Sequence, residues 1–290
     1  MNRPFRHHIR ETSEKSTARV TPAKIGAILL GGVFLGIILP VLVLFIVYVL
    51  YSPQLPDPRI LEDYTPTLVT RVISADSVVL AEFAGEKRIW VSLREISPNI
   101  IDAVLAAEDH RFNKHWGVNI WAILRAIYAN IKAGRRAQGA STITQQLTRS
   151  LFLTREKLIT RKIREGLTAL KMEKSYSKEE ILELFLNQQY LGKGCYGVEA
   201  ASRFFFNKKA SKADIKEAAT IAGLLQAPSR YINNPERLLT RRNTVLNQMF
   251  DNDMIDRKTL DSLTQEPLGI NYNEETASWK APYFVEYIRQ

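Results

Sequence analysis

The sequence predicts a mainly α-helical protein with one transmembrane helix near the amino terminus and a small β-hairpin. Three patterns support this fold class. The run 25–51 has no charged side chain, the segments 68–83 and 87–93 alternate apolar and polar residues, and apolar residues recur at helical spacing from about Pro98 onward. With 46% hydrophobic and 24% charged residues, the chain has the composition of a protein with a buried core.

The apolar segment 25–51 is long enough to cross a bilayer, because about twenty apolar residues suffice. The tail 1–24 that precedes it is basic, so the positive-inside rule predicts that this tail is cytoplasmic and that the rest lies outside the cytoplasm. We find no small-residue cleavage site near Ser52, which argues against a removable signal peptide.

The charge of the chain indicates a polyanionic partner. The net charge is +10 and the isoelectric point is near 9.6, which favours nucleic acid, an anionic membrane surface or a phosphorylated substrate. The predicted location outside the cytoplasm excludes nucleic acid. The single cysteine, Cys195, excludes an internal disulfide and a cysteine-based zinc site.

The remaining elements follow in chain order. Four prolines predict a stiff linker over 52–66, and the alternating segments within 52–97 predict the β-hairpin. A helical domain is expected over 98–265, with loops at 133–141 and 188–197. Its readable helices are 98–107, 119–132, 160–174, 177–187, 212–225 and 235–253, the fourth starting with the capping box of Ser177 and Glu180.

The stretch AAEDHRFNKHWG, 106–117, ends an apolar run with two acids. If the helix continued, Glu108, Phe112 and His115 would share one face. A carboxylate beside an aromatic ring loses solvation, which raises its pKa and suits it to proton transfer. A helix that ends in solvated acids explains the same letters, so the residues alone leave both interpretations open.

Two further segments offer polar groups to a substrate. In GASTITQQL, 139–147, small and hydroxylated residues suit sugar hydroxyls or phosphate oxygens near a helix start, although a simple Ser/Thr helix cap explains them as well. In 157–165, cations surround Glu165, an arrangement that could hold a pyrophosphate and an acid together, or that forms a solvated helix face. The glycine- and tyrosine-rich stretch 190–202 suggests a tight supporting loop.

Together these blocks resemble the family 51 glycosyltransferases, the peptidoglycan polymerases of class A penicillin-binding proteins and of monofunctional transglycosylases. The motifs ED-x-x-F-x-x-H-x-G, GAST-I-TQQ, RK-x-x-E and YLG-x-G-x-YG stand in the family's order at 108–117, 139–146, 161–165 and 190–197. A fifth block at 222–249 is similar too. The resemblance covers about residues 60–260 and implies a lysozyme-like helical glycosyltransferase domain.

The resemblance also implies roles for individual residues. Glu108 matches the catalytic base that deprotonates the acceptor hydroxyl of lipid II, and Glu165 matches the second essential glutamate, which assists at the diphosphate. The other matching positions are expected to bind or support the substrate: Asp109, Arg111, Phe112, His115, Ser141, Thr142, Gln145, Gln146, Arg149, Lys157, Arg161 and Lys162. Arg149 stands where many members have lysine, which keeps the charge but changes the phosphate geometry.

The resemblance further implies a location and partners. We expect a single-pass protein of the bacterial inner membrane whose partners are lipid II, the growing glycan strand and other proteins of cell-wall synthesis. Mg²⁺ or Mn²⁺ is the expected cofactor, with Asp109 and Glu165 as the only suggested ligands, and no organic cofactor is expected. Helix 119–132 is predicted either to enter the membrane interface or to pack in the core.

Two rival functions and one open question about the chain remain. A lysozyme-like lytic hydrolase would not need the cationic cluster at 161–165, and a non-catalytic membrane-anchored scaffold would not need both glutamates. Ser175 and Lys178 have the spacing of a transpeptidase motif, but no Lys-Thr-Gly follows. The tail 266–290 resembles the connector toward a transpeptidase domain, so we expect the amino-terminal part of a class A protein, with a monofunctional enzyme as the alternative.

Overall fold

The computed structural model describes residues 26, 31–32, 34–59, 70–76, 79–83, 87–134, 139–152 and 158–272. The chain forms two compact units, Met1–Pro53 and Gln54–Gln290, and each is described by itself. The predicted tail 1–24 and the end of the predicted connector, 273–290, lie outside the described residues. The domain limits inferred from the sequence stay predictions.

The first unit contains the apolar helix. A π-helical turn, Phe34–Ile38, leads into α2, Leu39–Tyr51, and a 3₁₀ turn, Ser52–Gln54, follows. The segment Phe34–Tyr51 is long and apolar enough to cross a membrane, and none of it is buried within the protein. The predicted apolar helix is therefore confirmed over its described part.

The predicted hairpin forms, but only from its first segment. Strands β1, Thr70–Ile73, and β2, Val79–Phe83, pair antiparallel, with Thr70 opposite Phe83. The second segment, 87–93, was expected to join them and does not. Its first two residues form β3, Lys87–Arg88, in a separate sheet.

The second sheet has the order β3-β5-β4, with β4 over Tyr190–Gly192 and β5 over Cys195–Tyr196. Strand β3 runs parallel to β5 and β4 runs antiparallel to it. The segment 188–197, expected as a loop, therefore contains two short strands. Their pairing with a segment about 100 residues earlier is a tertiary contact that local patterns do not encode.

The helices confirm the mainly α prediction: the six expected helices form, with ends that differ by a few residues, whereas α5, α8, α10 and α12 were not read individually from the sequence. Ser97 caps α3, which has proline in its first turn, and Ser177 forms the predicted capping box with Glu180. The helices are α3 Pro98–Glu108, α4 Ile120–Ala133, α5 Ile143–Phe152, α6 Leu158–Ser175, α7 Lys178–Gln188, α8 Val198–Phe206, α9 Ile215–Leu224, α10 Pro228–Ile232, α11 Pro235–Asp251 and α12 Arg257–Gln265. Short 3₁₀ turns stand at Leu93–Glu95, Phe112–Lys114 and Ala210–Lys212.

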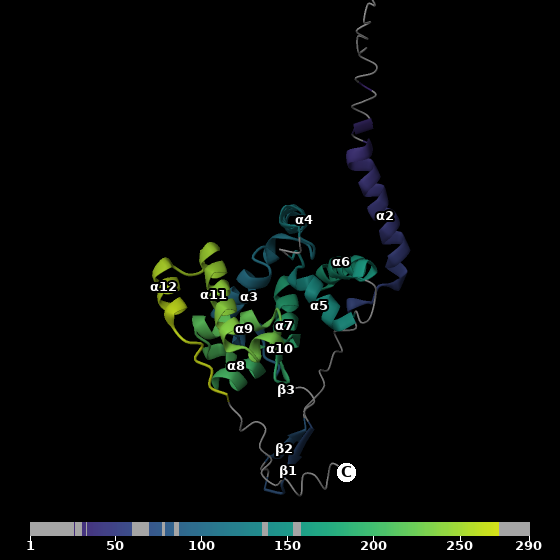
Figure 1. Ribbon diagram of the computed structural model, residues 1–290. Coiled ribbons are helices and arrows are strands. Elements are labelled where there is room, and N and C mark those ends of the chain that lie inside the picture. The colour runs from purple at the N-terminus through teal and green to yellow at the C-terminus, as the bar shows by residue number, and fades with distance from the viewer. Residues whose placement is uncertain are drawn as a thin grey trace, which may run out of the picture. The chain divides into compact units, whose positions relative to one another are not determined.

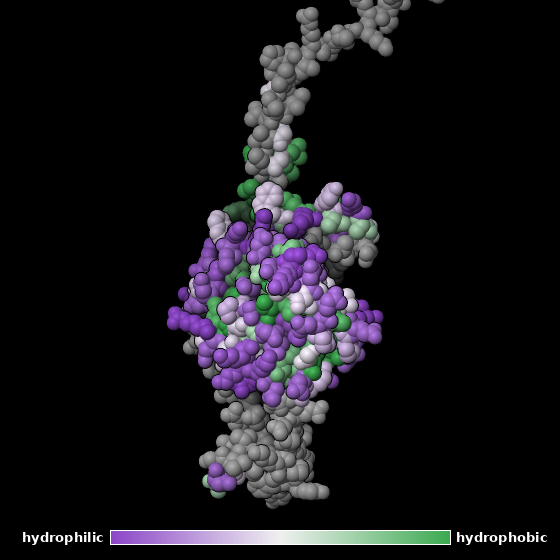
Figure 2. All heavy atoms as spheres, turned by 90° about the vertical axis from the view of Figure 1, so that its left-hand side faces the viewer, coloured by the Kyte–Doolittle hydropathy of each residue, from purple (hydrophilic) through white to green (hydrophobic). Residues whose placement is uncertain are grey.

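The core brings distant helices together in the second unit (Figure 1). Helix α9 is buried from Glu217 to Leu224 and packs against α3 and α11, while α5 packs against α6 and α7. The second and third sequence motifs meet where α5 packs on α6, and the first motif reaches α5 through the hydrogen bond from Gln146 to Glu108 at the end of α3. Figure 2 views the unit from the side of α12, where hydrophilic side chains cover most of the surface.

Part of the predicted linker packs on the second unit. Leu55 and Pro58 are buried, and the hydroxyl of Tyr176, just after α6, donates a hydrogen bond of 3.0 Å to the carbonyl oxygen of Pro58. Residues 60–66 of the linker lie outside the described residues. The segment 55–59 is thus fixed against the end of α6 by burial and by a hydrogen bond.

Candidate active site

Glu108 is the last residue of α3 and faces the start of α5 and the middle of α11. Gln146 Nε2 donates a hydrogen bond of 2.7 Å to Glu108 Oε2. Arg241 Nη2 lies 4.0 Å from Glu108 Oε1, and the glutamate side chain is 13% exposed. The carboxylate is therefore nearly enclosed, held by one neutral donor and approached by one cation.

Burial raises the pKa of Glu108 above the usual value of a glutamate. The hydrogen bond from Gln146 and the charges of Arg241 and Arg149 act in the opposite direction, and the nearby charge of Asp109 adds a small increase. Removal from water disfavours the charged form of a carboxyl, which makes its conjugate base a better proton acceptor. The loss of solvation predicted for Glu108 is present, but α3 ends at Glu108 and Phe112 lies in the 3₁₀ turn that follows, so the expected helical face shared with Phe112 and His115 does not form.

Asp109 holds the loop after α3 against the start of α5. Its Oδ2 lies 2.8 Å from His115 Nε2 and accepts a hydrogen bond of 3.2 Å from the amide of Ile143. The amide of Gly117 donates to His115 Nδ1 at 3.2 Å, so the ring carries its proton on Nε2 and donates it to Asp109. The buried Asp109 carboxylate therefore links the loop at His115 to the start of α5 through these two hydrogen bonds.

Gly117 has a backbone conformation that only glycine adopts without strain. Its φ is +84°, and a Cβ at this position would lie 2.8 Å from the carbonyl oxygen of Ala169 on α6. The carbonyl of Gly117 also accepts a hydrogen bond of 2.6 Å from the hydroxyl of Thr142. The glycine of the first motif therefore lets the loop lie directly against α6.

Phe112 stabilises the loop between α3 and α4 through its buried ring. The ring is buried, and Lys178 Nζ lies 4.3 Å from its centroid. Lys178 also donates 2.7 Å hydrogen bonds to the carbonyl of His115 and to Glu173. Phe112 and His115 thus stabilise the loop, whereas Arg111 is exposed and, among the residues that the structure describes, forms no hydrogen bond or ion pair with either glutamate.

Helix α5 begins with a reciprocal cap. Thr142 Oγ1 accepts a hydrogen bond of 3.1 Å from the amide of Gln145, and Gln145 Oε1 accepts one of 3.0 Å from the amide of Thr142. Both side chains are buried. The helix-cap interpretation of GAST is therefore present, and the prediction that Thr142 and Gln145 also bind substrate stays a prediction.

Glu165 lies in α6 and is fully buried. Lys162 forms an ion pair with its Oε2, and Arg161 Nε lies 3.5 Å from its Oε1. Lys162 Nζ also donates a hydrogen bond of 3.0 Å to the hydroxyl of Ser141, in the segment before α5. Lys162 remains 48% exposed and Arg161 29%, so both cations reach the surface from a buried carboxylate.

One helix connects the surroundings of the two glutamates. In α5, Gln146 contacts the Glu108 carboxylate and Thr148 Oγ1 lies 3.5 Å from the carbonyl of Glu165. Arg149, one residue further, is exposed and acts on the pKa of Glu108. The structure thus gathers most predicted site residues around α5: on α5 itself, on α6, and at the end of α3 with the loop that follows it. Lys157 lies outside the described residues.

The two carboxylates suggested as metal ligands do not fit a protein-held divalent cation. Asp109 is engaged with a histidine and a backbone amide, and Glu165 is engaged with two basic side chains. Within the described parts of the chain, no group of three or more His, Cys, Asp or Glu side chains is arranged to hold a metal ion.

Two contributors were missed by sequence reasoning. Arg241 approaches Glu108 from α11, 133 residues later in the chain, and Lys178 joins the loop at His115 from α7. The block 222–249 that contains Arg241 resembled the family, but the Arg-Arg pair in it was not singled out. Only the packing of α11 on α3 makes its role visible.

Comparisons with known proteins identify the family. Residues 76–250 match the transglycosylase family. Penicillin-binding protein 1A from Aquifex aeolicus (strain VF5) is 40% identical over 258 residues, which cover 88% of this chain and 35% of the relative. The protein of the same name from Escherichia coli (strain K12) is 40% identical over 249 residues, which cover 84% of this chain and 29% of the relative.

Among solved structures, penicillin-binding protein 1A from Haemophilus influenzae is similar at 25% identity and a TM-score of 0.46, over 78% of this chain and 24% of that chain. The chain spans about a third of the length of the curated relatives that it matches. The family match covers more than half of the chain and includes all four motifs at 108–117, 139–146, 161–165 and 190–197. The chain belongs to the transglycosylase family.

Proposed function

We propose that this protein polymerises lipid II into β-1,4-linked glycan strands of peptidoglycan, with inversion at the anomeric carbon and release of undecaprenyl diphosphate. The observation that carries the proposal is the enclosed carboxylate of Glu108, raised in pKa by burial and held by Gln146, within a chain of the transglycosylase family. The names of the relatives, penicillin-binding proteins, agree with a role in the cell wall.

Glu108 is the general base of the proposed reaction. The 4-hydroxyl of the acceptor sugar attacks the anomeric carbon of the lipid-linked chain, and its proton passes to the Glu108 carboxylate. The bond from that carbon to the diphosphate breaks at the same time, and the electron pair leaves with the diphosphate. Attack from the opposite face inverts the configuration, so a single base is enough and no covalent intermediate is required.

The cations around Glu165 stabilise the leaving diphosphate in this proposal. Arg161 and Lys162 are both partly exposed and both anchored to the buried Glu165 carboxylate. Positive groups held in place before the reaction stabilise developing negative charge without a cost of reorganisation. Glu165 therefore acts as a positioning residue that orients two cations, and its own charge prevents the two from repelling each other.

An exposed apolar face on α4 supports access to a lipid-linked substrate. The large apolar side chains on and beside this helix face solvent, with Ala126 the buried residue of the helix. They are Trp116, Ile120, Trp121, Leu124, Ile127, Tyr128 and Ile131, all more than half exposed. Such a face is typical of a helix that lies in a membrane interface. Of the two alternatives for this helix, core packing is excluded by the exposure.

The same proposal includes anchoring by the apolar helix Phe34–Tyr51. At 1.5 Å per residue this helix spans roughly 27 Å, close to the hydrocarbon thickness of a bilayer. The basic tail before it supports a cytoplasmic amino terminus and a domain outside the cytoplasm. The requirement for Mg²⁺ or Mn²⁺ stays a prediction, which a polymerisation assay with and without a chelator would test.

The direct experiment is to incubate the purified chain with labelled lipid II and to separate the products by gel electrophoresis. We expect a ladder of glycan products that lysozyme degrades. Cleavage of an existing glycan without polymer formation would instead favour the lytic hydrolase. No reaction with either substrate, from a folded protein that binds lipid II, would favour the scaffold.

A further inference from the structure

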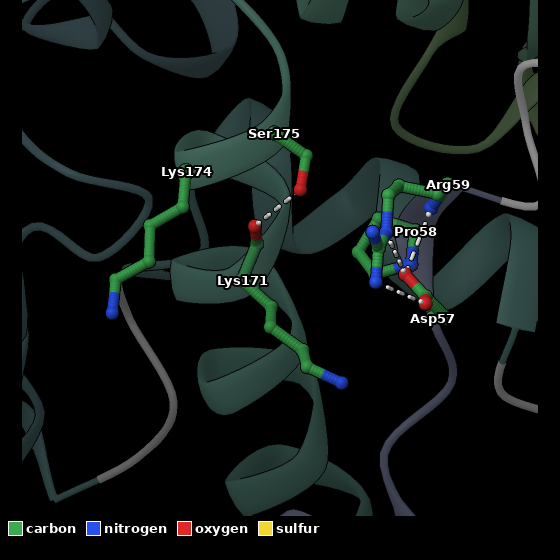
Figure 3. A pocket seen from close by; sticks show the side chains of 6 residues that line it. All are labelled: Asp57, Pro58, Arg59, Lys171, Lys174 and Ser175. Atoms are coloured by element: carbon green, nitrogen blue, oxygen red, sulfur yellow. Dashed lines mark hydrogen bonds and ion pairs between the residues drawn. The ribbon is translucent and has the colours of Figure 1, made fainter.

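A hollow outside the catalytic site lies where the chain reaches the second unit after the apolar helix. It has a volume of about 410 Å³ and is lined by Asp57, Pro58, Arg59, Lys171, Lys174 and Ser175. Figure 3 shows these side chains, with the 57–59 segment on one side and the last turn of α6 on the other. All six residues belong to the second unit.

The wall formed by residues 55–59 is fixed in place. Leu55 and Pro58 are buried, and Tyr176 binds the carbonyl of Pro58. The carboxylate of Asp57 accepts hydrogen bonds of 3.1 Å from the amide and from Nη2 of Arg59. These contacts keep the Arg59 guanidinium beside Asp57 at one side of the hollow.

The charge of the hollow is positive. Three cations, Arg59, Lys171 and Lys174, line it together with one carboxylate, Asp57. No hydrogen bond or ion pair is formed by the Nζ atoms of the two lysines within the described part of the chain. Lysines in a last helical turn also stabilise the helix dipole, but that interaction leaves their ammonium groups able to bind an anion. Any anion must be bound by these side chains, because the carboxyl end of α6 repels it.

The sequence places the hollow close to the membrane surface. Asp57 follows Tyr51, the last residue of α2, by six positions, and six residues span at most roughly 20 Å. This upper limit follows from chain length alone, whatever the arrangement of the two units. If α2 anchors the chain as proposed, a basic hollow this near the end of a membrane span meets lipid headgroups before it meets other anions.

We propose that this hollow binds the headgroup of an anionic phospholipid, with Arg59, Lys171 and Lys174 around the phosphate. Basic side chains next to a membrane span are attracted to anionic lipids, each adding to the affinity. The bound lipid ties the end of α6, the helix of Glu165, to the membrane surface. The site is separate from the residues assigned to catalysis.

The test uses the full chain in non-ionic detergent micelles, titrated with phosphatidylglycerol while native mass spectrometry counts the bound lipid. We expect Lys171→Gln to weaken binding about fivefold and the double variant with Lys174→Gln about 25-fold, as each cation near a charged membrane surface contributes. Asp57→Asn removes the negative charge from the hollow, and we expect this variant to bind the lipid at least as tightly as the native protein.

The matched control removes two exposed lysines away from the hollow, Lys212→Gln with Lys258→Gln, and we expect affinity within twofold of the native chain. An equal loss in this control would overturn the proposal, as it would reduce the effect to net charge. Binding of phosphatidylcholine as tightly as phosphatidylglycerol would overturn it too. Inorganic phosphate alone binding as tightly as the lipid would assign the hollow to a free anion. Because lipid counting needs no lipid II, a failure here is distinct from a failure of the polymerase proposal.

Discussion

Glu108 and Glu165 are the same residue type in opposite surroundings. Glu108 keeps some exposure, contacts a neutral amide at 2.7 Å, and has a pKa raised by burial. Glu165 is fully buried between two basic side chains. A carboxylate that loses water while its nearest cation, Arg241, stays 4.0 Å away is suited to act as a base, whereas one that is closely paired with two cations becomes their anchor. The difference assigns a separate role to each.

The two glutamates should also affect stability with opposite signs. The pKa of Glu108 is raised in the folded protein, so the unfolded chain ionises first as pH rises. The contribution of Glu108 to stability is therefore fully present below its unfolded pKa. It declines as pH rises and is lost above its folded pKa. Above its folded pKa the charge on Glu108 destabilises the fold, and this penalty disappears as pH falls through that pKa.

The largest effect is expected for Glu108→Gln. The substitution removes the proton acceptor, for which losses of about 10²- to 10⁴-fold are typical, and it should leave lipid II binding measurable. Because it also removes a charge that burial disfavours, the melting temperature at pH 7 should not fall. Product ladders on a gel and thermal unfolding measure the two quantities.

Asp102→Asn is the matched control for this variant. Asp102 lies on the same helix, and burial raises its pKa as well, but among the described residues it forms no hydrogen bond or ion pair with Glu108. Its amide variant should polymerise lipid II at the native rate. Normal glycan ladders from Glu108→Gln, or an equal loss from the Asp102 variant, would contradict the role of Glu108 as base.

The second effect is expected for Glu165→Gln, with the opposite change in stability. The substitution leaves Arg161 and Lys162 without their anion, and polymerisation should fall about 100-fold as their positions relax. Because both cations are partly exposed, the loss of folding free energy should be about 1–2 kcal/mol, less than for a fully buried pair. Chemical denaturation measures it.

A double-mutant cycle sharpens this prediction. Adding Lys162→Gln to Glu165→Gln removes one of the two cations that lost their partner, so part of the stability should return. If Glu165→Gln unfolds at the same denaturant concentration as the native chain, the carboxylate is not the anchor of the cations. Native turnover in the same variant would remove it from the active site altogether.

A smaller effect is expected for Gln146→Leu, and it concerns pH rather than maximal rate. The amide hydrogen bond lowers the pKa of Glu108, so its removal should raise that pKa further. Activity requires the ionised carboxylate and declines as pH falls through its pKa, so the acid limb of the pH–rate profile should move to higher pH. Gln265→Leu, exposed at the end of α12, should leave the profile unchanged. A limb that moves to lower pH would contradict the assignment of Glu108.

Local features of the sequence were sufficient to predict most helices. The proline in the first turn of α3 and the capping box at Ser177 act on neighbouring residues, so their effect can be read from the letters. The pairing of Lys87 and Arg88 with β5 could not be predicted in this way, since it joins segments more than 100 residues apart. Short strands of this kind depend on how the helices pack around them.

The same distinction between local features and long-range contacts applies to the candidate site. The apolar run before Glu108 indicated an enclosed position without excluding a solvated one, and the spacing of four residues allowed Arg161 to pair with Glu165. Arg241 reaches Glu108 only because α11 packs on α3. The exposure of the apolar face of α4 was left undecided, because the spacing of apolar residues is the same in a core helix and in a helix at a membrane surface.

The smallest predicted effect separates a cap from a substrate contact at Thr142. Thr142→Ala removes the side chain that accepts from Gln145 and donates to Gly117, which should cost about 1 kcal/mol and lower the melting temperature by about 2–4 °C. Thr142→Ser keeps the hydroxyl and should retain most of this stability. If Thr142 is only a cap, the KM for lipid II measured well below the melting temperature stays at the native value. A raised KM in the alanine variant, restored by serine, would show that the hydroxyl also binds substrate, as the family resemblance implies.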